Sequence, residues 1–210
     1  MRFLPPPPTA AWQHHGARAG FEIAYLQRRG GHWQLEGFTT AIEDGQTWAV
    51  EYQIEVDATW RTRNAHIRGR SLAGRRSIVL EGDGAGNWLI DGQPAPTLQG
   101  CLDIDLELSA LTNALPVHRM GLPVGGRGVA PAAYVRAVDL TVDRLEQTYV
   151  RITDEGMHSA MNMLRLSFNS LAVSSTTRLG SYSTIQASPP ELVETRSHRV
   201  GPRVVINSLE

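Results

Sequence analysis

Residues 48–57 have the sequence WAVEYQIEVD, in which every second residue from Trp48 to Val56 is large and apolar. The residues between them are Ala, Glu or Gln, so the apolar pattern repeats with a period of two. A period of two places successive side chains on opposite faces of a β-strand. The stretch therefore predicts a strand with one buried face and one polar face.

Further strand-like segments lie on both sides of this one, separated by short turns that contain glycine. Glycine adopts the positive φ angles of hairpin turns without steric cost. The spacing of these turns, with no amphipathic helix between them, favours a mainly β, single-domain antiparallel sheet that is curled or closed. One short helix is expected over 157–168. The remaining expected strands are 21–27, 32–38, 60–69, 76–81, 87–91, 101–108, 134–143 and 146–153.

The two ends of the chain differ in composition from its middle. Four consecutive prolines, Pro5 to Pro8, predict that residues 1–12 form a disordered leader, and the β domain is expected over 13–173. Serine occurs three times in the first 150 residues and ten times in the last 60. We expect residues 174–210 to be a poorly ordered tail, and hypothesise that they are translated out of frame, which resequencing the gene would test.

The composition excludes several classes of function. The chain has 210 residues and a net charge of −1, which argues against nucleic-acid binding. All 20 basic residues are arginine, so the usual P-loop, kinase and Schiff-base sites, which need lysine, are excluded. A single cysteine, Cys101, excludes an internal disulfide and paired-cysteine zinc sites. No apolar run suits a membrane span, and without a recognisable signal segment we expect a cytoplasmic protein.

The strongest candidate for chemistry is the stretch GCLDIDLEL at 100–108. On a strand, Cys101, Asp103, Asp105 and Glu107 share one face, opposite an apolar face. That face could be a solvated acidic surface. If the sheet curls so that it points inward, the carboxylates need partners, for which arginines are the strongest candidates.

Two other segments could complete such a site. Thr112 and Asn113 begin a turn that leads to Arg119, so a network of Asp103 and Asp105 with Arg119 is geometrically reasonable. Trp60 lies beside Arg61 and Arg63, a combination that suits sugar rings, phosphates or lipid headgroups. A core tryptophan beside surface arginines is the structural alternative.

These motifs resemble a bacterial family named "Putative glycolipid-binding". The resemblance is carried by GCLDIDL at 100–106, TNALPVHRM at 112–120 and the patch from Asp57 to Arg63. It extends over residues 20–152. The sequence departs from the family pattern at Ser109-Ala110, where the family has Thr-Pro, and at His118, where it has the first of two arginines.

The resemblance implies a spiral β-roll, a half-open barrel similar in shape to bacterial lipoprotein-localisation factors. It further implies a non-catalytic protein that binds a glycolipid or another amphipathic small molecule against a concave apolar sheet face. No cofactor, metal or catalytic residue is expected. The residues expected to bind the ligand are Trp60, Arg61, Arg63, Cys101, Asp103, Asp105, Thr112, Asn113 and Arg119.

Two alternative functions remain open from the sequence. Asp103 and Asp105 could act as acid and base, or as metal ligands, in a hydrolase that acts on a sugar or ester. The polar cluster could instead hold a corner of a structural or interaction protein. A metal-dependent activity would favour the hydrolase, and an assembly partner would favour the structural protein.

Overall fold

A computed structural model of the chain describes residues 6–14, 19–43, 45–151, 164–168, 185–186 and 204–208. Most of these residues lie in strands, and one α-helix, α1 (Ala114–Met120), accompanies them. The predicted mainly β fold with one short helix is confirmed. The strands of the largest sheet are β1 (Thr9–His14), β2 (Ala19–Arg29), β3 (His32–Glu43), β4 (Gln46–Val56), β5 (Thr62–Ser71), β6 (Gly74–Gly82), β7 (Trp88–Ile90), β8 (Gln93–Pro94), β15 (Ile185–Gln186) and β16 (Val204–Ser208).

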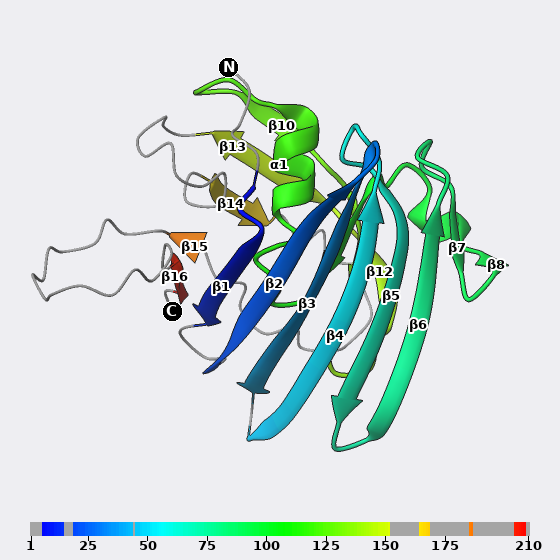
Figure 1. Cartoon of the computed structure of the whole chain (residues 1–210), viewed down its shortest axis with the longest axis vertical. Helices are drawn as coiled ribbons and strands as arrows, with labels where there is room; N and C mark the ends of the chain where they lie inside the picture. Colours follow the sequence, from blue (N-terminus) through cyan, green and yellow to red (C-terminus); the bar gives the residue numbers. More distant parts are fainter. Residues whose placement is uncertain are drawn as a thin grey trace, which may run out of the picture.

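The largest sheet follows the chain order from β1 to β8, with each strand antiparallel to the next. β16 joins the outer edge of β1 in parallel, and β15 follows it. The sheet order begins at β15 and ends at β8, so the sheet is not closed on itself. Figure 1 shows its long strands curving side by side, with β12 behind β4 and β5 and with α1 near one end.

Two three-stranded sheets complete the fold. One has the order β12-β11-β9, with β9 parallel to β11, and the other has the order β10-β13-β14. A 3-10 turn, Pro96–Leu98, precedes β9. The strands are β9 (Asp103–Leu106), β10 (Arg127–Val129), β11 (Ala132–Val135), β12 (Val142–Leu145), β13 (Gln147–Arg151) and β14 (Leu164–Phe168).

The inner face of the largest sheet packs against these later elements. In β4, Trp48 and Val56 are at most 4% exposed, as the alternation predicts. Ile104 and Leu106 of β9 and Leu115 of α1 are at most 1% exposed. Burial of one such side chain stabilises the fold by about 1.5–3 kcal/mol. Among the described residues, the apolar inner face of this sheet is covered by the protein's own core.

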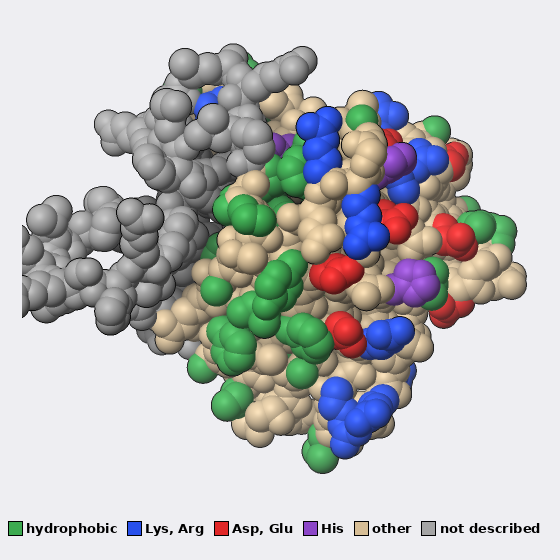
Figure 2. Space-filling view, in the orientation of Figure 1, with side chains coloured by type: hydrophobic (Ala, Val, Ile, Leu, Met, Phe, Trp, Pro, Cys, Tyr) green, Lys and Arg blue, Asp and Glu red, His purple; other side chains and the backbone are tan. Residues whose placement is uncertain are grey.

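The outer face of the same sheet faces solvent. Figure 2 shows charged side chains on it beside a group of hydrophobic ones. Phe21 in β2 and Phe38 in β3 are about half exposed, at 54% and 45%. Tyr25 and Ile42 of the same two strands are also exposed, so these side chains form one apolar group on the outer face.

Most strand boundaries differ from the prediction by a few residues, among them those of β9, which spans Asp103–Leu106 and not 101–108, and three of the differences have a clear physical reason. β1 begins at Thr9, inside the segment expected to be a leader, because Trp12 is buried and the strand pairs with β2. The strand predicted from residue 60 begins at Thr62, because Trp60 belongs to the preceding turn. The strand predicted over 134–143 is divided into β11 and β12 by a turn in which Leu140 has φ 58°.

The helix lies at a different place from the one predicted. Residues 164–168 of the expected helix form β14, which pairs with β13, and the rest of 157–168 lies outside the described residues. α1 contains Pro116 in its first turn, where a missing N–H costs no helical hydrogen bond. Gly121 caps the end of the helix: it has φ 54°, and its N–H donates to the Val117 carbonyl.

The predicted tail 174–210 lies outside the described residues except for β15 and β16, and its disorder stays a prediction. No described helix is both long enough and apolar enough to cross a membrane.

Candidate functional site

The acidic face of β9 points into the protein. Cys101 and Asp103 are 1% exposed and Asp105 is 8% exposed. The opposite face is also buried, so all four residues of β9 lie in the interior. The alternative of a solvated acidic surface is therefore wrong, and each carboxylate must be matched by donors inside the protein.

Asp103 is paired with Arg119 of α1. The Arg119 Nε lies 3.1 and 3.2 Å from the two carboxylate oxygens, and its Nη2 donates to Oδ2 at 2.5 Å. Burial raises the pKa of Asp103, while the hydrogen bonds and charge of Arg119 and the charge of Arg61 oppose that rise. The predicted ion pair between this strand and Arg119 is present for Asp103.

Asp105 binds neutral donors instead of an arginine. Its Oδ1 accepts from the Thr112 hydroxyl at 3.0 Å and its Oδ2 from the Gln147 amide at 2.6 Å. Burial raises the pKa of Asp105 to about 6, because the two hydrogen bonds only partly offset desolvation. The predicted network of both aspartates with Arg119 is thus wrong for Asp105.

The hydrogen bonds of Asp105 extend to Asn113 through β13. The Tyr149 hydroxyl lies 3.0 Å from Gln147 Oε1 and 3.2 Å from Asn113 Oδ1. The Asn113 amide also donates to the Ser109 carbonyl at 3.1 Å. Thr112 and Asn113, both candidate ligand residues, therefore join β9 to β13.

A third buried carboxylate, Glu22 of β2, was not found from the sequence. Its Oε1 accepts from the hydroxyls of Tyr52 and Ser109, each at 2.6 Å, and its Oε2 accepts from the Ala110 N–H at 2.6 Å. The residue is 0% exposed, and burial raises its pKa to about 7. Glu22 thereby ties the largest sheet to the turn between β9 and α1.

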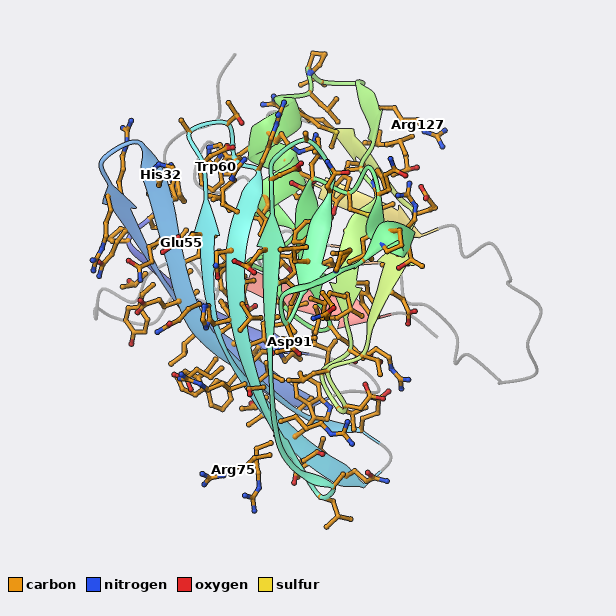
Figure 3. All side chains as sticks on the ribbon, turned by 90° about the vertical axis from the view of Figure 1, so that its right-hand side faces the viewer. His32, Glu55, Trp60, Arg75, Asp91 and Arg127 are labelled. Atoms are coloured by element: carbon orange, nitrogen blue, oxygen red, sulfur yellow. The ribbon has the colours of Figure 1, made fainter. Side chains whose placement is uncertain are left out.

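An aromatic group lies at one end of the sheet, which we call the Trp60 stack: Trp33, Trp60 and His118. The Trp60 ring is stacked on Trp33, with centroids 5.3 Å apart, and on His118, with centroids 4.2 Å apart. Each of the three side chains is partly exposed. Figure 3 shows Trp60 at the same end of the sheet as His32, and Arg75 at the opposite end.

The turn between β4 and β5 holds Trp60 in an uncommon backbone conformation. Asp57 Oδ1 accepts hydrogen bonds from the N–H groups of Thr59 and Arg61 and from the Thr59 hydroxyl. Trp60 itself has φ 64°, in the left-handed region that bulky residues rarely adopt. The sequence offered no signal for the partners of Trp60, because they come from β3 and α1.

The other candidate residues lie around this end of the protein. The Arg61 Nη1 donates to the Gly84 carbonyl at 2.7 Å. Arg63 donates to the Asp83 carbonyl and lies 3.9 Å from the Asp57 carboxylate. Cys101 lies 3.6 Å from an Arg144 nitrogen, and burial raises the pKa of its thiol to about 11.

Both aspartates of β9 are engaged by side chains within the protein. Asp105 uses both carboxylate oxygens for internal hydrogen bonds, and Asp103 uses both for Arg119. Within the described ranges, no group of His, Cys, Asp or Glu could hold a metal ion. Of the candidate residues, Arg61 is exposed, and Trp60, Arg63, Asn113 and Arg119 are partly exposed.

Comparison with known proteins supports the fold and identifies the family. No curated protein matches the sequence. The crystal structure of a DUF1089 family protein from Pseudomonas aeruginosa is similar, with a TM-score of 0.61 and 25% sequence identity over 84% of this chain and 87% of that one. The model of the family described as "Putative glycolipid-binding" matches residues 9–177, so the chain belongs to that family.

Proposed function

We propose that the protein binds an amphipathic small molecule, a glycolipid by the name of its family, and releases it chemically unchanged. The polar head lies against the Trp60 stack, next to the ion pair of Asp103 and Arg119. The observation that carries this proposal is the stack itself, a group of three partly exposed aromatic rings. The apolar face of an aromatic side chain packs well against the apolar face of a sugar ring.

The backbone of Trp60 supports a binding role. A residue other than glycine with φ near +60° destabilises the folded protein by about 1 kcal/mol or more. Residues in such strained conformations are common at functional sites. The hydrogen bonds of Asp57 hold the turn in this form before any ligand arrives. A ring that is already in place loses less conformational entropy on binding.

The buried candidate residues support this surface from the interior. Asp105, Thr112 and Asn113 fix the start of α1 against β9 and β13, and α1 carries His118 and Arg119 to the surface. We assign these interior residues a positioning role, and the ligand contacts to the Trp60 stack, Arg61, Arg63 and Arg119.

Native mass spectrometry of the full chain tests the proposal most directly. The native mass is compared with the denatured mass, and a species that leaves intact on denaturation identifies the ligand class. We expect an intact amphipathic molecule with a sugar head. A bound molecule recovered only as hydrolysed fragments would contradict release of the ligand unchanged.

A titration with octyl glucoside below its micelle concentration, followed by tryptophan fluorescence, locates the site. Trp60→Ala should weaken binding about tenfold or more, since a well-packed aromatic contact contributes more than 1 kcal/mol. Phe38→Ala is the matched control, because it removes an exposed aromatic ring from the outer face of the sheet. Equal loss in both variants would indicate non-specific apolar binding.

A further inference from the structure

The outer face of the largest sheet carries two arginines directly opposite each other. Arg70 of β5 is paired with Arg75 of β6, next to the turn that joins the two strands. Both residues are exposed, and within the described part of the chain neither guanidinium forms an ion pair or a hydrogen bond. Like charges at opposite positions of an antiparallel pair destabilise a sheet. The stability of the fold therefore does not account for this pair.

Positive charge is in excess around these two arginines. Arg68 lies on the same face of β5, two residues from Arg70, and its Nη1 is 3.6 Å from the Glu51 carboxylate. Three arginines thus accompany one carboxylate in this half of the outer face, although the whole chain has a net charge of −1. The strand register places in the other half of the face the carboxylates of Glu36, Glu55 and Glu81.

Two further carboxylates near this end of the sheet belong to its inner side. Glu43 is the last residue of β3 and follows the exposed Ile42, so the alternation of the strand places it on the inner face. Asp139 forms an ion pair with Arg136 and also interacts with the charge of Arg76. Neither carboxylate is paired with the two opposed arginines of the outer face.

Exposed apolar side chains border these arginines. Phe21 lies in the same row across the sheet as Arg70, and Ile42 lies one row nearer the end of the sheet; they are 54% and 51% exposed. Leu72, in the turn between β5 and β6, is 87% exposed. Figure 2 shows hydrophobic side chains and arginines together on the lower part of this face, and Figure 3 shows Arg75 at the lower end of the sheet. We define the basic corner as Phe21, Ile42, Leu72, Arg70 and Arg75.

We propose that the basic corner docks the protein on an anionic membrane surface. The Arg70 and Arg75 guanidiniums bind lipid phosphates, whose charge offsets the repulsion between the two arginines. The side chains of Phe21, Ile42 and Leu72 enter the boundary between the headgroups and the acyl chains. This inference goes beyond the small-molecule binding proposed above and does not depend on it.

Leu72 favours a membrane over an acidic protein as the partner. It lies in a hairpin turn, two residues after Arg70 and three before Arg75. A fluid bilayer accepts an apolar side chain at any point of its surface, whereas a protein partner needs a pocket that fits the side chain. Apolar area and positive charge on one surface together strengthen binding to anionic lipids.

Vesicle flotation of the full chain tests the proposal. Two sets of vesicles are compared, one of phosphatidylcholine alone and one that contains a third of phosphatidylglycerol. At neutral pH and low salt we expect binding to the anionic vesicles to be about tenfold tighter or more, and to weaken strongly in about 0.5 M salt. Equal binding to the two sets, or binding to neither, would overturn the proposal.

The double variant Arg70→Gln/Arg75→Gln assigns the binding to this corner. It should bind anionic vesicles about thirtyfold more weakly, since each arginine near such a surface contributes about fivefold. In urea denaturation it should be at least as stable as the natural protein, because the repulsion is gone. Arg28→Gln/Arg29→Gln, at the opposite end of the sheet, makes the same change in net charge and is the matched control. Equal losses in both double variants would show that net charge and not the corner determines binding, and the proposal would fail.

Leu72→Gln separates docking on a membrane from capture of free anions. It removes apolar area without a change in charge and should weaken binding to the anionic vesicles about fivefold. Val129→Gln, at a position of β10 that is 65% exposed, is the matched control and should leave binding unchanged. If Leu72→Gln binds as tightly as the natural protein, the corner captures anions without entering the membrane interface, which contradicts the proposal.

Discussion

Gly37 in β3 lies directly opposite Tyr52 in β4, and a Cβ atom at Gly37 would collide with the Tyr52 hydroxyl. Tyr52 therefore reaches across the sheet only because position 37 has no side chain. Its hydroxyl donates to Glu22 at 2.6 Å, in the fully buried interior. The glycine thus makes room for a hydrogen bond between β4 and β2, the two strands that flank β3.

Gly37→Ala should lower the free energy of unfolding by about 2–3 kcal/mol, because Tyr52 must move and Glu22 loses a donor in the interior. Urea denaturation measures the change. Gly31→Ala is the matched control, since a Cβ there meets no atom within 4 Å, and it should change stability by less than about 0.5 kcal/mol. Equal stability of the two variants would contradict this role of Gly37.

The buried Glu22 predicts how stability depends on pH. Burial raises its pKa from 4.5 to about 7, so the folded protein holds this proton more tightly than the unfolded chain does. The stabilisation that protonated Glu22 contributes to the folded protein is fully present below pH 4.5, and it is lost as the pH rises towards 7. By linkage, the contribution of this group to the free energy of unfolding falls by about 3 kcal/mol across that window.

Glu22→Gln removes this titration and keeps the shape of the side chain. We expect the variant to lack the part of the pH dependence between pH 4.5 and 7 that the natural protein shows in urea denaturation. Asp105, with a pKa of about 6, contributes in the same direction in both proteins, so only the difference between their curves is diagnostic. Parallel curves would contradict the raised pKa of Glu22.

The sequence was sufficient to predict a strand and its buried face where one face of the strand is apolar and the other is not. In β4, Trp48 to Val56 alternate and are buried as predicted. The ion pair of Asp103 with Arg119 was also predictable, because a buried carboxylate needs a partner and arginine is the only long-chain base in this chain.

Glu22 was not predictable by the same means. β2 has apolar side chains on both faces, with Phe21 and Tyr25 outward and Ala24 and Leu26 inward, so its periodicity does not say which face is buried. The contacts of the neighbouring strands decide this, and they depend on the curl of the whole sheet.

The Trp60 stack was not predicted from the sequence, for a different reason. Its members come from β3, from the turn before β5 and from α1, and their meeting depends on where α1 lies. The sequence around Thr112 and Pro116 indicated a turn, whereas the structure continues it into a helix. Without that helix, the contact of His118 with Trp60 could not be predicted.

The ion pair of Asp103 and Arg119 should couple these two residues strongly. Arg119→Gln leaves a buried carboxylate without its cation and should destabilise the protein by about 3–5 kcal/mol. The double variant Asp103→Asn/Arg119→Gln should be more stable than Arg119→Gln alone, because the uncompensated charge is gone. A double-mutant cycle from urea denaturation measures the coupling.

A second arginine pair supplies the control for that cycle. Arg136 and Asp139 are 3.6 Å apart, with side chains that are 49% and 32% exposed. Solvent screens such a pair, so Arg136→Gln should cost about 0–1 kcal/mol. Comparable losses at Arg119 and Arg136 would show that burial of Asp103 is not the source of the effect.

The left-handed conformation of Trp60 predicts an unusual order of stabilities. Trp60→Ala and Trp60→Gly both remove the stacked ring, but only glycine adopts φ 64° without strain. We expect the glycine variant to be the more stable of the two by about 1 kcal/mol, in contrast to ordinary turn positions. Ala58→Gly, two residues earlier in the same turn and without positive φ, should instead destabilise the protein. If Trp60→Ala proves at least as stable as Trp60→Gly, the turn relaxes once the ring is lost, and the ring itself imposes the strained backbone.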